Sequence, residues 1–139
     1  MRYTLDASVA LKWELPEPDS DKANQLRDDF RNGVHELIAP DSFILEVAHG
    51  LAKAERQGRI TDAEQLWLDA MTTCPDLRPF QPLMLRAVQM ARLARIGVYD
   101  CLYVALAERE GCELVTADDR LVRTLQPTFP FITSLASLS

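Results

Sequence analysis

Short apolar runs alternate along the chain with longer segments in which apolar residues recur at helical spacing. The apolar runs predict five strands, at residues 2–5, 36–39, 77–80, 113–116 and 129–133. The segments between them predict helices that begin near residues 8, 20, 42, 62, 82, 99 and 118. Strands that alternate with helices pair in parallel and are covered on both faces. The pattern therefore predicts an α/β domain with three α/β/α layers and a central, mostly parallel sheet of four or five strands.

The long helix predicted from residue 42 to about residue 58 has an apolar and a polar face. Its apolar stripe is predicted to consist of Ile44, Val47, Ala48 and Leu51. The polar face carries Glu46 and, at helical spacing from it, Ser42, His49 and Lys53. Because Glu46 lies inside the helix, capping cannot explain it, although it could be an ordinary solvated glutamate.

Two acidic residues directly follow predicted strands. Asp6 follows the strand at 2–5, and Asp118 follows the strand at 113–116. In a parallel sheet both would project from the carboxyl edge, where such sheets bind ligands at the point of strand-order reversal. Each of them, like Asp100, also stands at the start of a predicted helix, so each alone could be a helix cap. Asp119 is a first-turn or solvated acid by the same reasoning, although it could reach the same site.

The interpretation of these carboxylates changes if Asp6, Glu46, Asp100 and Asp118 converge at this edge. Two carboxylates about 4 Å apart repel by about 4 kcal/mol at an effective dielectric constant of about 20. Several such pairs require protonation or a bridging cation. A cluster of oxygen ligands without a His or Cys cage suits Mg²⁺ or Mn²⁺, and such ions commonly serve phosphodiester hydrolysis.

Composition limits the class of protein. The length of 139 residues predicts one domain over 1–139, and 47% hydrophobic with 26% charged residues is typical of a globular chain. No apolar run is long enough to span a bilayer and the N-terminus lacks a secretory signal, so we expect a cytoplasmic location and no membrane partner. The net charge of −6 argues against a general nucleic-acid binder but leaves local phosphate contacts open.

Other catalytic motifs find little support. The five glycines are isolated, so no Gly-rich phosphate loop is present, and two histidines are too few for a histidine-based metal site. No nucleophile elbow accompanies His49. A phosphatase of the haloacid-dehalogenase type is disfavoured, because Ala7 and Ser8 follow Asp6 where an Asp-x-Asp motif is needed. Ser8 is better placed as a helix cap or as a contact to metal-bound water.

Four strings resemble the PIN domain, in particular the VapC-type ribonuclease toxins of toxin–antitoxin pairs: LDASVALKWELPE, ILEVAHGL, VYDCLYVALAE and LVTADDRL. They stand in the order of the family, and the resemblance covers nearly the whole chain. It implies that divalent metal is bound by the matching acids, which are Asp6, Glu46, Asp100 and Asp118. The family's Thr-x-Asp matches Thr116 and Asp118, which favours Asp118 over Asp119. Thr116 and Ser8 would then support the site through their hydroxyl groups.

The resemblance also implies endonucleolytic cleavage of RNA, a homodimer, and a small VapB-type antitoxin that covers the site. Because the total charge is acidic, RNA is expected to contact a local basic rim, with Lys53, Arg56 and Arg120 as candidates. Many family members have Asn where this chain has His49. We hypothesise that His49 makes activity weaker or pH-dependent, and a His49→Asn variant with the same pH–rate profile would refute this.

Two alternatives stay open at this point. A non-catalytic interaction module with the same fold would bind a partner protein through the acidic groove. The four acids would also suit a phosphatase or a DNA nuclease that uses the same ions, and only the resemblance separates RNA from DNA. No motif in the chain encodes which RNA is cut.

Overall fold

The computed structural model describes residues 1–138, so the last residue of the domain predicted over 1–139 lies outside the described range. Within it the strands are β1 (Arg2–Leu5), β2 (Glu36–Pro40), β3 (Asp76–Arg78), β4 (Glu113–Thr116) and β5 (Ile132–Ser134). They form one five-stranded sheet in the order β3-β2-β1-β4-β5, and every pairing is parallel. The predicted three-layer α/β/α class is confirmed, with the larger of the two predicted strand numbers.

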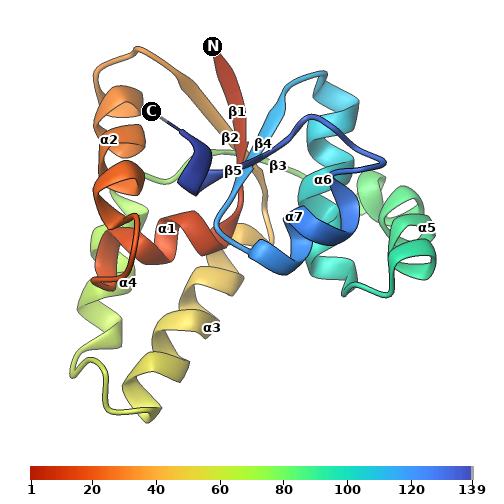
Figure 1. Cartoon of the computed structure of the whole chain (residues 1–139). Helices are drawn as coiled ribbons and strands as arrows, with labels where there is room; N and C mark the ends of the chain where they lie inside the picture. Colours follow the sequence, from red (N-terminus) through yellow and green to blue (C-terminus); the bar gives the residue numbers. More distant parts are fainter. Residues whose placement is uncertain (139) are drawn as a thin grey trace.

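Seven helices cover the sheet within residues 1–138: α1 (Ala7–Glu14), α2 (Ser20–Arg31), α3 (Phe43–Arg56), α4 (Ala63–Met71), α5 (Met84–Ala94), α6 (Val98–Glu110) and α7 (Asp119–Leu125). Figure 1 shows α1 to α4 on one side of the sheet and α5 to α7 on the other. This separation follows from right-handed crossovers, because the chain builds β1, β2 and β3 in one direction and then returns to add β4 and β5. Strand order therefore reverses between β1 and β4.

The core lies on both faces of the inner strands. Leu5, Leu37, Leu114 and Val115 are fully buried in β1, β2 and β4. Helix α6 is enclosed between these strands and α5, and every residue from 101 to 107 is buried. Its first turn is consequently held at a fixed position beside the carboxyl edge of the sheet. No helix within residues 1–138 has the length and apolar character needed to cross a membrane.

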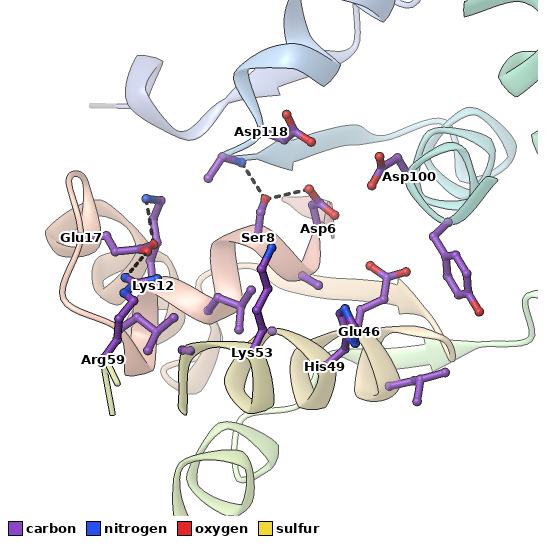
Figure 2. A pocket seen from close by; sticks show the side chains of 18 of the residues that line it. Asp6, Ser8, Lys12, Glu17, Glu46, His49, Lys53, Arg59, Asp100 and Asp118 are labelled. Atoms are coloured by element: carbon purple, nitrogen blue, oxygen red, sulfur yellow. Dashed lines mark hydrogen bonds and ion pairs between the residues drawn. The ribbon is translucent and has the colours of Figure 1, made fainter. Parts of the chain in front are cut away.

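The predicted apolar stripe of α3 is correct at Val47 and Leu51 and wrong at its other two positions. The buried side chains are Phe43, Val47, Leu51 and Ala54, whereas Ile44 is 37% exposed and Ala48 is half-buried. The larger Phe43 takes the core position, and the backbone carbonyl oxygen of Ile44 accepts a hydrogen bond from Trp67 Nε1 of α4 at 3.1 Å. Glu46 lies on the side of α3 that faces the sheet edge (Figure 2).

Two predicted strands also differ at their ends. The last strand begins at Ile132 rather than at Phe129, because the Phe129 amide donates to the Leu125 carbonyl at 2.8 Å and closes α7. The third strand spans Asp76–Arg78 rather than 77–80, since the chain enters a short 3₁₀ helix (Gln81–Leu83) directly after Phe80. Apolar side chains alone do not separate a strand from a packed turn in these segments.

Gly50 permits the close approach of α1 and α3. A Cβ atom at this position would lie 2.6 Å from Leu11 Cδ1 and 2.8 Å from Leu11 Cδ2. We expect Gly50→Ala to lower the free energy of unfolding by about 1 kcal/mol, because displacing Leu11 outweighs the better helix propensity of Ala. Urea denaturation measures this. In a Leu11→Ala background the same Gly50→Ala change should no longer be destabilising, because the contact with Leu11 is gone. A Gly50→Ala variant that is more stable than the native chain would contradict this explanation.

Candidate active site

A groove of about 820 Å³ opens at the carboxyl edge of the sheet, beside the point where strand order reverses. All four acids singled out from the sequence line it: Asp6 after β1, Glu46 on α3, Asp100 on α6, and Asp118 after β4. Figure 2 shows their carboxylates arranged around a common space. Residues separated by up to 112 positions in the chain thus face one cavity.

Asp6 is buried and held by two hydroxyl groups. Thr116 Oγ1 donates to Asp6 Oδ2 at 2.6 Å and Ser8 Oγ donates to the same oxygen at 2.7 Å. Asp6 is the N-cap residue of α1, but its side chain makes no capping hydrogen bond. The Ala117 amide donates to Ser8 Oγ at 3.0 Å, which joins α1 to the end of β4. Capping alone therefore does not account for this carboxylate.

Asp118 and Asp100 are positioned by the starts of two helices. Asp118 Oδ1 accepts hydrogen bonds from the Arg120 and Leu121 amides at 3.0 and 3.3 Å, so this residue does cap α7. Asp100 is not a cap, because the N-cap of α6 is Gly97 and Asp100 lies in the first helical turn. Capping uses one oxygen of Asp118 and fixes the direction of the other.

Tyr103 is a member of the site that the sequence did not single out. Its side chain is fully buried on α6, one turn after Asp100, and its hydroxyl group donates to Glu46 Oε2 at 3.0 Å. Glu46 Oε1 is buried and has no hydrogen-bond partner among the described residues. The glutamate is thus fixed through one oxygen, while its second oxygen is left for a group that the site would bind.

Burial and neighbouring negative charge raise the pKa of three of the acids, Asp6, Glu46 and Asp100. Burial, and then the charge of Asp6, raise the pKa of Glu46 to about 8, against the lowering effect of the Tyr103 hydrogen bond. Burial and the charges of Asp6 and Asp118 raise the pKa of Asp100 to about 6, although Arg120 opposes this. Burial also raises the pKa of Asp6 despite its two hydroxyl donors. The fully ionised cluster is therefore unfavourable without a compensating positive charge.

A small, hard cation fits this donor set. Within residues 1–138 no three His, Cys, Asp or Glu side chains lie close enough together to hold a metal ion by themselves. Mg²⁺ does not require one, because it usually keeps several waters and is held by one or two carboxylates together with substrate phosphates. The groove offers carboxylate oxygens, an unpartnered buried Glu46 oxygen, and acids with raised pKa values. A bound Mg²⁺ or Mn²⁺ would give these oxygens a partner and would compensate the negative charge of the acids.

The basic residues around the groove differ in part from those considered in the sequence. Lys53 lines the groove, and exposed His49 lies near Glu46 on the same helix. Arg56 is not a lining residue, and neither is Arg120, whose guanidinium group donates to the Arg95 carbonyl at 3.3 Å. Two further cations do line it, Lys12 and Arg59. Only tertiary packing brings these two together, so no sequence spacing indicates them.

Comparisons with known proteins agree with the fold. Ribonuclease VapC3 of Pyrobaculum aerophilum is 29% identical over 127 residues, which are 87% of this chain and 92% of that protein. The solved structure of PAE2754 from the same organism has a TM-score of 0.69 at 21% identity and covers 99% of this chain and 94% of its own. VapBC2 of Rickettsia felis, solved with a fragment of promoter DNA, has a TM-score of 0.65 at 17% identity, over 96% and 98% of the two chains. The sequence model of the PIN domain matches residues 3–125, and the chain therefore belongs to the PIN domain family.

Proposed function

We propose that this protein is a metal-dependent endoribonuclease that acts as the toxin of a toxin–antitoxin pair. One observation carries the proposal: four carboxylates from separate segments face one groove at the strand-order reversal, and three of them have raised pKa values. Membership of the PIN domain family supports it, as does the relative that is named a ribonuclease.

Each acid has a proposed role. Asp6, Asp100 and Asp118 would hold Mg²⁺ or Mn²⁺, and Glu46 would hold a second ion or orient the attacking water. When bound, such an ion would activate water for attack and stabilise the leaving oxygen of the phosphodiester. Ser8 and Thr116 would fix the Asp6 carboxylate by donating to Oδ2, so that the ion meets an oriented ligand.

The partners follow from the same proposal. RNA is the substrate, and a VapB-type antitoxin would place an Arg or Lys among the carboxylates and neutralise them as a metal does. The solved VapBC2 complex of Rickettsia felis supports a partner of this class. We further propose a single domain over 1–139, a homodimer, and a cytoplasmic location, where RNA is accessible.

Cleavage of mixed cellular RNA tests the function. Purified protein, free of antitoxin, would be incubated with Mn²⁺, with Mg²⁺ and with a chelator, beside the Asp6→Asn and Asp100→Asn variants. We expect discrete fragments that require metal and are absent with both variants. Cleavage that survives both substitutions would show contamination by another nuclease and would contradict the proposal.

A non-catalytic interaction module is the second candidate. It is favoured by one observation, that no three acids within the described part of the chain form a complete metal cage. In this case the acidic groove would receive a cationic side chain of a partner protein and no ion. Failure of the folded, antitoxin-free protein to cut RNA under any metal condition would favour this candidate over the nuclease.

Tyr103→Phe tests how Glu46 is positioned. The variant keeps the buried ring but removes the hydroxyl that donates to Glu46 Oε2. Loss of a side chain that orients a metal ligand typically costs 10–100-fold, so we expect Mn²⁺ affinity and RNA cleavage to fall by about 10-fold. The Tyr3→Phe variant serves as a control, because Tyr3 lies on β1 outside the groove. Equal Mn²⁺ affinity in both variants would exclude a positioning role.

A further inference from the structure

The groove that holds the four acids continues along α1 and α3 to a second end of opposite charge. Lys12 and Arg59 line this end, and Lys53 lies on the wall between the two ends (Figure 2). Lys12 follows Asp6 by six residues on α1, which places it about 9 Å further along the helix axis at 1.5 Å per residue. A single strand of nucleic acid lying along the groove would therefore contact the acids at one end and the cations at the other.

Glu17 joins the two cations at the basic end. Its Oε1 lies 3.4 Å from Lys12 Nζ, and its Oε2 lies 2.7 Å from Arg59 Nη2. The Lys12 side chain is only 13% exposed, so this ammonium group is held in place rather than free in solvent. A carboxylate between an ammonium and a guanidinium group has the charge and the paired oxygens of a backbone phosphate. The groove therefore already contains an anion-binding arrangement that is occupied by the chain's own carboxylate.

We infer that Lys12 and Arg59 bind a backbone phosphate of the RNA whose reacting phosphate lies among the acids, and that Glu17 competes with this phosphate for the same cations. This inference rests on the proposed ribonuclease function. Arg59 offers paired N–H donors that match two phosphate oxygens, and Lys12 supplies a point charge. Lys53 also lines the groove and adds a third positive charge close to these two.

The inference predicts opposite effects for the two kinds of residue. Lys12→Met keeps the aliphatic stem and Arg59→Gln keeps a polar side chain, and each removes one positive charge. We expect each variant to bind single-stranded RNA about 5–10-fold more weakly and to reduce the slope of log affinity against log salt by about 1. Glu17→Gln removes the internal competitor, so we expect RNA to bind it about 3–10-fold more tightly.

Fluorescence anisotropy with a 5′-labelled single-stranded RNA, in chelator to prevent cleavage, measures binding at several salt concentrations. Cleavage kinetics with Mn²⁺ then separate KM from kcat, and the two cation variants should raise KM with little change in kcat. Arg92→Gln and Asp28→Asn are matched controls, because they make the same charge changes at exposed positions of α5 and α2 outside the groove. Melting temperatures within a few degrees of the native chain confirm that the variants are folded.

The outcomes separate this inference from the function on which it rests. If the native chain cuts RNA but Lys12→Met and Arg59→Gln match Arg92→Gln in affinity, salt slope and KM, the phosphate site is overturned and the ribonuclease stands. If Glu17→Gln binds RNA no more tightly than Asp28→Asn, competition by Glu17 is overturned. If the native chain neither binds nor cuts RNA, the ribonuclease proposal fails, and the phosphate site fails with it.

Discussion

Asp6→Asn should abolish RNA cleavage while making the metal-free protein more stable. Asp6 is 4% exposed, and burial raises its pKa even though Ser8 and Thr116 donate to it. The Asn carbonyl oxygen can accept the same two hydroxyl groups without carrying a charge. We expect cleavage to fall at least about 100-fold, because a metal ligand is lost. The free energy of unfolding without metal, at about pH 8, should rise, because a buried charge that burial disfavours is removed.

Urea denaturation and a single-turnover cleavage assay measure the two effects on the same preparation. Asp28→Asn, on the exposed side of α2, makes the same chemical change outside the groove and should alter neither quantity. A variant that loses both activity and stability would show that Asp6 is a structural residue. Retention of cleavage would remove Asp6 from the proposed metal site.

The stability of the metal-free protein should fall as pH rises from about 5 to about 8. The pKa of Glu46 is raised to about 8 and that of Asp100 to about 6, so the folded protein keeps protons that the unfolded chain has already released. Their stabilising contribution is complete below the unfolded pKa values near 4 and is lost as pH rises through the folded values. We expect a loss of roughly 2 kcal/mol, after allowing for solvent screening at partly exposed Asp100.

Added Mn²⁺ should restore this stability at the alkaline end and have less effect near pH 5, where Glu46 and Asp100 are mostly protonated. Glu14 also contributes to the pH dependence, because burial and Asp69 raise its pKa to about 7, but it lies outside the groove. Its contribution should therefore persist in Mn²⁺, and Glu14→Gln isolates it. Thermal unfolding across this pH range, with and without Mn²⁺, measures both parts. Stability that does not fall with rising pH, or that Mn²⁺ does not restore, would contradict the account.

The sheet and its edge could be predicted because they depend on local pattern. Alternating apolar runs specify parallel strands, and parallel strands place Asp6 and Asp118 at one edge whatever the details of packing. The structure brings both residues to the same groove, together with Glu46 and Asp100. The roles of these acids in catalysis stay a prediction, and the experiments above address them.

Other features depend on tertiary packing and leave no local signal. Residues 101–107 of α6 are all buried, so this stretch has no polar face against which Tyr103 would stand out. Arg59 meets Glu17 across 42 positions of sequence, and no spacing rule connects them. On α3, Phe43 and Ile44 are both apolar neighbours, and only competition for the core decides which of them is buried.

Direct measurement of Mn²⁺ binding tests the central claim, that the acids of the groove form one metal site. Calorimetric titration at about pH 8 would compare the native chain with Asp100→Asn, Glu46→Gln and the control Asp28→Asn. A lower pH is unsuitable, because Glu46 has a pKa of about 8 and is mostly protonated below it. We expect the native chain and the control to bind Mn²⁺ equally, and both groove variants to bind it at least about 10-fold more weakly. Equal affinity in all four proteins, or no binding by the native chain, would contradict the metal site and with it the proposed chemistry.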